Sequence, residues 1–175
     1  MKRWIGFIPV LLLAACATVA PNVDTDKIRL LCLPDYGVEV PVPTGWTAAR
    51  LHGDELSFFE IASPERDFLL LFTGTNPGDP LPLLASLRDA TKNSGFKTKD
   101  VARTIDGLAV TGFVTTDRGP EEWLMLASHP RSVYMFMVRV EPDISAADRA
   151  AGFYLLDHMK LRGIDAGCPP ESWTE

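Results

Sequence analysis

Residues 133–140 have the sequence Val-Tyr-Met-Phe-Met-Val-Arg-Val, and residues 67–73 have the sequence Asp-Phe-Leu-Leu-Leu-Phe-Thr. Both runs are short, rich in aromatic or branched residues, and apolar at odd and at even positions. Alternate side chains of a strand point to opposite faces of its sheet, so a strand that is apolar at both parities lies in a sheet covered on both sides. We therefore predict that these two runs are strands near the centre of such a sheet.

More strands are predicted before and between these two runs. The predicted strands are residues 38–42, 55–62, 67–73, 96–105, 108–116, 122–128 and 133–140. Asp106-Gly107 is a two-residue loop of the type that matches the twist of a hairpin, and other short turns predict a mostly antiparallel sheet. In residues 38–42 valines alternate with Glu39 and Pro41, and the prolines at positions 41 and 43 predict an edge strand.

Two helices are predicted. The first follows Asp79, an N-cap residue type, begins at Pro80 and extends to about Ser94, with Gly95 as its C-cap. The second opens on a capping box at Ser145 and extends to about Leu161. Their predicted apolar stripes are Leu83, Leu84, Leu87, Ala90, Thr91 and Ser94 in the first helix, and Ile144, Ala147, Ala151, Tyr154, Leu155 and His158 in the second. One helix on each face of the sheet gives an α/β/α sandwich of the α+β class.

The N-terminus has the features of an export signal. Lys2 and Arg3 precede an apolar run from Trp4 to Leu13, which is shorter than the roughly 20 residues of a spanning helix. The following Leu13-Ala14-Ala15-Cys16 resembles the bacterial lipobox. This resemblance implies that residues 1–15 are a signal peptide and that Cys16 carries a diacylglyceryl group and a further acyl chain such as palmitate. The alternative is an ordinary secretory signal with a chance cysteine.

The remaining chain divides simply. Residues 16–27 are small and polar without periodicity, which is typical of a flexible tether, and residues 28–175 have the size of a single globular domain. Lipidation implies a bacterial lipoprotein that is anchored in a membrane of the cell envelope. Ala17 stands where an aspartate often signals inner-membrane retention, which favours the outer membrane with the domain facing the periplasm.

Charge and cysteine content agree with export. The net charge is −6, and loss of Lys2 and Arg3 makes the mature chain more acidic, which argues against binding to nucleic acid. Cys32 and Cys168 are predicted to form a disulfide bond, as an even pair in an oxidising compartment does; the alternative is two unrelated buried thiols. These cysteines lack the spacing of a zinc site, and no metal or cofactor is predicted.

The sequence contains no catalytic motif of the common types GxSxG, HExxH, Walker loop or GxGxxG. The three histidines are His52, His129 and His158, and only His52 has acidic neighbours, Asp54 and Glu55. We therefore predict that the protein is not an enzyme. The alternative is a small-ligand carrier or a weakly marked hydrolase that uses the His52 region.

Methionines and the C-terminal tail add two hypotheses. Met125, Met135 and Met137 lie in predicted strands and are expected to fill the core, although methionine also lines adaptable apolar grooves. Trp173, in the tail after Cys168, is a candidate surface contact.

A family resemblance follows from three motifs. Val-Pro-Val-Pro-Thr-Gly-Trp at 40–46, Ile-Asp-Gly at 105–107 and Val-Tyr-Met-Phe-Met-Val at 133–138 occur in an order that resembles the PsbP-like fold over Tyr36 to Leu161. Bacterial members of this family include exported lipoproteins of the DcrB type. The resemblance implies a non-catalytic binding or assembly module with an envelope protein as partner, and it assigns no functional residue.

The lipobox resemblance generates one direct test. Cys16→Ser removes the thiol that the lipid would modify, and without acyl chains the acidic domain has no stable attachment to a bilayer. We expect the variant to move from the membrane pellet to the soluble fraction in cell fractionation. An unchanged membrane fraction would contradict anchoring by lipid.

Overall fold

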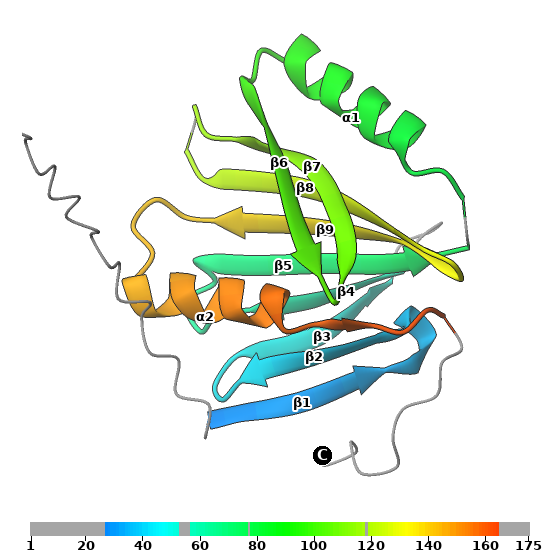
Figure 1. Ribbon diagram of the computed structural model, residues 1–175. Helices are drawn as coiled ribbons and strands as arrows, with labels where there is room; N and C mark the ends of the chain where they lie inside the picture. Colours follow the sequence, from blue (N-terminus) through cyan, green and yellow to red (C-terminus); the bar gives the residue numbers. More distant parts are fainter. Residues whose placement is uncertain (1–26, 53–56, 77, 118, 165–175) are drawn as a thin grey trace, which may run out of the picture.

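The computed structural model describes residues 27–52, 57–76, 78–117 and 119–164 (Figure 1). The predicted signal peptide, most of the predicted tether, Cys168 and Trp173 lie outside these ranges.

Seven strands form one antiparallel sheet in the order β3-β4-β5-β9-β8-β7-β6. The strands are β3 (Thr47–His52), β4 (Ser57–Ala62), β5 (Phe68–Thr75), β6 (Thr98–Ile105), β7 (Leu108–Thr115), β8 (Glu121–His129) and β9 (Ser132–Val140). β5 and β9 pair over their full length near the middle, with Leu71 opposite Met137. The prediction that these two runs are central strands is confirmed.

A second, smaller sheet has the order β1-β2-β10. It consists of β1 (Ile28–Leu33), β2 (Val38–Pro43) and β10 (Lys160–Leu161), and the short 3₁₀ helix η2 (Pro34–Tyr36) connects β1 to β2. β1, β10 and, in the large sheet, β3 were not among the predicted strands. Figure 1 shows this small sheet beside α2, on the opposite side of the molecule from α1.

The prediction of an edge strand at residues 38–42 is wrong, because β2 is the middle strand of the small sheet. Pro41 and Pro43 remove no hydrogen bond from the small sheet, because of the direction in which their backbone nitrogens face. The Thr44 N–H donates to the Lys27 carbonyl, on the side of β1, so the N–H positions of residues 41 and 43 face the other way. On that side β10 pairs only with Val38 and Glu39. Proline is therefore tolerated where the third strand has already ended.

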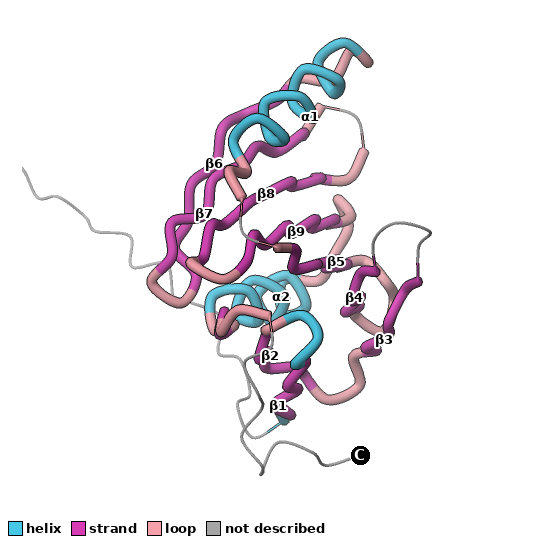
Figure 2. Tube along the Cα trace, turned by 90° about the vertical axis from the view of Figure 1, so that its right-hand side faces the viewer, coloured by secondary structure: helices cyan, strands magenta, loops and turns pink. Residues whose placement is uncertain are grey.

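The two helices are α1 (Leu81–Asn93) and α2 (Ala146–Asp157). α2 packs between the small sheet and one face of the large sheet, and α1 lies over the other face near β6 and β7 (Figure 2). This arrangement confirms the predicted α+β fold with a helix on each face.

The predicted helix ends and stripes need correction. α2 ends at Asp157, four residues before Leu161, and the next residues form β10. Its N-cap is as predicted, since the Ser145 hydroxyl accepts a hydrogen bond from the Asp148 N–H at 3.0 Å. In α1 the side facing the sheet carries Leu84 and Leu87, whereas Leu83 is 48% exposed.

One buried tyrosine links the two sheets. The Tyr134 hydroxyl, from β9, donates to the carbonyl oxygen of Gly37 at 2.9 Å and accepts from the N–H of Gly163 at 2.7 Å. Burial raises the pKa of the Tyr134 hydroxyl above its ordinary value, so this group keeps the proton that it donates. A Cβ at Gly37 would lie 2.1 Å from the Gly163 carbonyl carbon, so only glycine permits this close approach.

α2 approaches the large sheet closely at Gly152. A Cβ there would lie 2.3 Å from the ring of Phe68, which is fully buried. We expect Gly152→Ala to lower the free energy of unfolding by about 1–3 kcal/mol through overpacking, although alanine is the better helix former.

The measurement is chemical denaturation with Gly78→Ala as the matched control, because a Cβ at Gly78 meets no atom within 4 Å. The control should unfold like the wild type. Equal stability of the two variants would show that α2 does not pack on Phe68 as described.

Candidate binding groove

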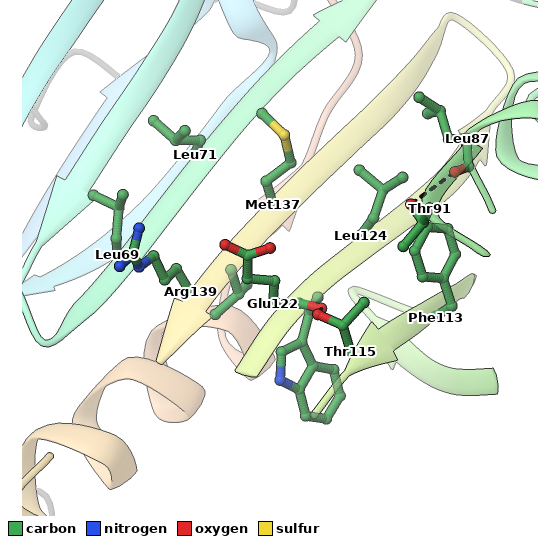
Figure 3. Close-up of a pocket in the computed structure, with 12 residues that line it drawn as sticks. Leu69, Leu71, Leu87, Thr91, Phe113, Thr115, Glu122, Leu124, Met137 and Arg139 are labelled. Carbon is green, nitrogen blue, oxygen red and sulfur yellow. Dashed lines mark hydrogen bonds between the residues drawn. The ribbon is translucent and has the colours of Figure 1, made fainter. Parts of the chain in front are cut away.

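The face of the large sheet that α1 overlies is built from side chains in rows across the strands. Strand register places Leu71, Met137, Leu124 and Phe113 next to one another, on β5, β9, β8 and β7 in turn. We call these four residues the apolar row, and Figure 3 shows them side by side. The neighbouring row contains Arg139, Glu122 and Thr115 on β9, β8 and β7, and we call it the polar row.

α1 covers only part of this face. Leu84 packs against Phe113 and Leu126, and Leu87 joins the same cluster from the next turn of the helix. Neither described α-helix lies over this face at the β5 end of the apolar row (Figure 2). This leaves a groove of about 400 Å³ beside α1. It is lined by Leu69, Leu71, Leu87, Thr91, Phe113, Thr115, Glu122, Trp123, Leu124, Met137, Val138 and Arg139.

Few polar groups of the groove are free to meet a ligand. The Thr91 hydroxyl donates to the Leu87 carbonyl at 2.8 Å, which the dashed line in Figure 3 marks. Arg139 directs both Nε and Nη2 to one oxygen of Glu141, each at 2.8 Å. Glu122 is exposed directly opposite Arg139 in the strand pair, and its carboxylate has no hydrogen bond or ion pair with any other described residue.

One charged side chain holds α1 against the sheet. Arg88 forms an ion pair with Asp100 of β6 at 3.0 Å and donates to the Gly112 carbonyl of β7 at 3.3 Å. Its guanidinium also lies 5.6 Å from the centre of the Phe113 ring. Leu84 is the one buried residue of α1, so the contacts of Arg88 add to a small apolar contact in fixing the helix beside the groove.

The three histidines lie in different parts of the structure, and only His52 was predicted as a candidate. His52 is exposed at the end of β3, and its predicted partners Asp54 and Glu55 lie outside the described residues. His129 ends β8, and its Nδ1 accepts a hydrogen bond from the Arg131 N–H at 3.1 Å. His158 is the C-cap of α2 and stacks on Tyr154, with the ring centroids 3.9 Å apart. Within the described ranges no three His, Cys, Asp or Glu side chains are grouped to hold a metal ion.

The predictions for the cysteines and methionines have different outcomes. Cys32 lies in β1 and is 2% exposed, but Cys16 and Cys168 are outside the described residues, so lipidation and the disulfide stay predictions. Met125 is fully buried, as predicted for a core residue. Met137 instead lines the groove, the use that the sequence left as the alternative.

The arrangement is suited to binding. Most of the lining is apolar, and the polar row supplies one cation and one carboxylate without a nucleophile and base in contact. The groove was not predicted, although the sequence contained one signal for it. Two strands that are apolar on both faces need cover on both faces. The helix predicted between residues 80 and 94 is short for covering one whole face of the sheet.

The comparisons with known proteins establish the fold. No family model matches this chain, and no curated protein matches it. Among solved structures, cyanobacterial PsbP (CyanoP) from Synechocystis sp. PCC 6803 matches with a TM-score of 0.55 and 12% identity, over 85% of this chain and 98% of that chain. This match supports the PsbP-like fold that the sequence resembles.

Two further structures are more distant. LpqN, described as involved in cell envelope biogenesis of Mycobacterium tuberculosis, has a TM-score of 0.47 at 15% identity, over 76% of this chain and 89% of that chain. A protein of Bacteroides thetaiotaomicron has a TM-score of 0.43 at 9% identity, over 78% of this chain and 49% of that chain.

The α-helices of the described ranges are α1 and α2, and neither is long and apolar enough to cross a bilayer.

The attachment of α1 can be tested by removing its charged contact. We expect Arg88→Gln to increase amide hydrogen exchange in residues 81–93, because the ion pair with Asp100 is lost and Leu84 alone remains buried. Arg66→Gln is the matched control, since Arg66 pairs with Glu60 on β4 and does not contact α1. Unchanged exchange in α1 would show that Arg88 does not hold the helix.

Proposed function

We propose that this chain is a non-catalytic binding module of the bacterial cell envelope, held at the membrane by lipid on Cys16, and that it binds an envelope partner through the groove beside α1. The observation that carries the proposal is the incomplete cover of the apolar row. Leu71 and Met137 occupy central strands, yet the helix on their face stops short of them.

The energetics favour a binding role for this surface. Burying apolar surface contributes roughly 25 cal/mol per Å², and apolar patches on the surface of soluble domains commonly mark interaction sites. The sheet under the groove is well supported, because β9 is paired on both sides along nearly its whole length and β5 is paired on both sides from Leu69 to Phe72. The surface is therefore already formed before a partner binds, and little binding free energy is lost in ordering this surface.

The membrane tether is supported by the sequence. The lipobox resemblance at residues 13–16 implies acylation, and Ala17 favours the outer membrane with the domain facing the periplasm. A disulfide between Cys32 and Cys168 is consistent with that compartment. Attachment by lipid also fits an acidic domain, which has no charge attraction to anionic lipid.

A second candidate function is that of a small-ligand carrier, and one observation favours it. The groove volume of about 400 Å³ falls within the roughly 300–1,000 Å³ of small-molecule sites. The hydrolase alternative gains no comparable observation, since His52 is exposed at the end of β3 and Asp54 and Glu55 lie outside the described residues.

The groove can be tested with one substitution and a matched control. Leu71→Gln places an amide in the apolar row, whereas Leu51→Gln makes the same change at a 40% exposed leucine of β3, on the same face but outside the groove. With lipidated protein as bait in detergent-solubilised membranes, we expect Leu71→Gln to lower retention of the bound partner about tenfold, equivalent to about 1.4 kcal/mol.

Leu51→Gln should retain the partner like the wild type, and circular dichroism should show that both variants are folded. The same loss in both variants, or none in Leu71→Gln, would argue against the groove as the binding site.

A further inference from the structure

The size and lining of the groove limit what can fill it. Its volume of about 400 Å³ is close to that of a single turn of an α-helix about 10 Å wide with a 5.4 Å pitch. A helical segment of a partner would leave most of its apolar face outside. The apolar side chains that line it are mostly aliphatic, with the adaptable Met137 among them, and an unbranched hydrocarbon chain packs well against such a surface. They are Leu69, Leu71, Leu87, Phe113, Trp123, Leu124, Met137 and Val138.

Charges of opposite sign lie next to each other beside the groove. Glu122 and Arg139 are directly opposite on β8 and β9, a position in which Cβ atoms are about 4.5–5.5 Å apart. The Glu122 carboxylate has no partner among the described residues, and Arg139 uses Nε and Nη2 on Glu141, so its Nη1 remains available. A ligand at this edge therefore meets a carboxylate and a guanidinium N–H side by side.

The balance of these charges discriminates between head groups. One cation and two carboxylates, Arg139 with Glu122 and Glu141, border this end of the groove. A purely anionic head would approach two carboxylates, and a purely cationic head could pair with Glu122 but would leave Nη1 of Arg139 without a partner. A head that carries one ammonium and one phosphate can place each beside the opposite charge.

From these observations we infer that the groove binds a single-chain zwitterionic lipid, with its hydrocarbon chain along the apolar row, its ammonium at Glu122 and its phosphate at Arg139. This inference rests on the proposed function, in that it takes the groove as the binding site, and it adds the chemical class of the ligand. The envelope membrane to which the tether would attach the domain is a source of such lipids.

Titration calorimetry with the soluble chain that begins at Ala17 tests the inference. The probes are lysophosphatidylethanolamine, lysophosphatidylglycerol and an alkyltrimethylammonium salt with the same chain length, each below its critical micelle concentration. We expect the ethanolamine lipid to bind most tightly, Leu71→Gln to abolish its binding, and Leu51→Gln to leave its binding unchanged.

The head-group contacts are tested by two further variants. Glu122→Gln should weaken the ethanolamine lipid by up to about fivefold and should not weaken the glycerol lipid, which lacks the ammonium. Arg139→Gln should weaken both phosphate-bearing lipids and not the alkylammonium. The two variants should therefore affect different sets of lipids, whereas a general loss of stability would weaken the binding of all of them.

Three results would overturn the inference: no binding of the ethanolamine lipid, binding that Leu71→Gln does not change, or equal affinity for all three head groups. If the lipid does not bind while Leu71→Gln still releases the membrane partner, the ligand class is wrong and the proposed function stands. If both assays are unaffected by Leu71→Gln, the groove itself is not the binding site.

Discussion

The structure depends on one constraint, the burial of two neighbouring strands that are apolar on both faces. β5 and β9 pair along their full length, and each presents one set of large side chains to either side of the sheet. On one side α2 and the small sheet exclude water from Phe68, Phe136 and their neighbours. On the other side α1 is the only helix of the described chain, and it does not extend as far as β5.

The two faces are held with different strength. On the α2 side, Tyr134 ties the sheets together through Gly37 and Gly163, and Gly152 lets the helix contact the Phe68 ring. On the α1 side, a cluster of three buried residues and the contacts of Arg88 hold the helix. Gly37 and Gly152 leave no room for a Cβ, so the α2 side is closely packed, whereas the α1 side keeps a groove.

Much of the fold followed from local sequence signals. Strands with apolar runs, the Asp106-Gly107 turn and the Ser145 cap are each specified by a few adjacent residues, and all three were predicted at their observed places. β1, β3 and β10 were missed because their pairing partners decide them: β3 is mostly exposed, and β10 has two residues. The same reason explains the error at β2, where the third strand, not the proline, determines which strand is central.

The sequence alone determined that β5 and β9 are central and that the N-terminus resembles a lipobox, because each of these depends on periodicity or on adjacent residues. It also predicted one helix on each face, because both faces of the central strands are apolar and two helices were available to cover them. Only the tertiary structure decided that Leu71, Met137 and Leu124 form a row, that Glu122 lies opposite Arg139, and that α1 leaves this row partly open. These relations depend on strand register and on the position of α1, and both arise from contacts between residues far apart in the chain.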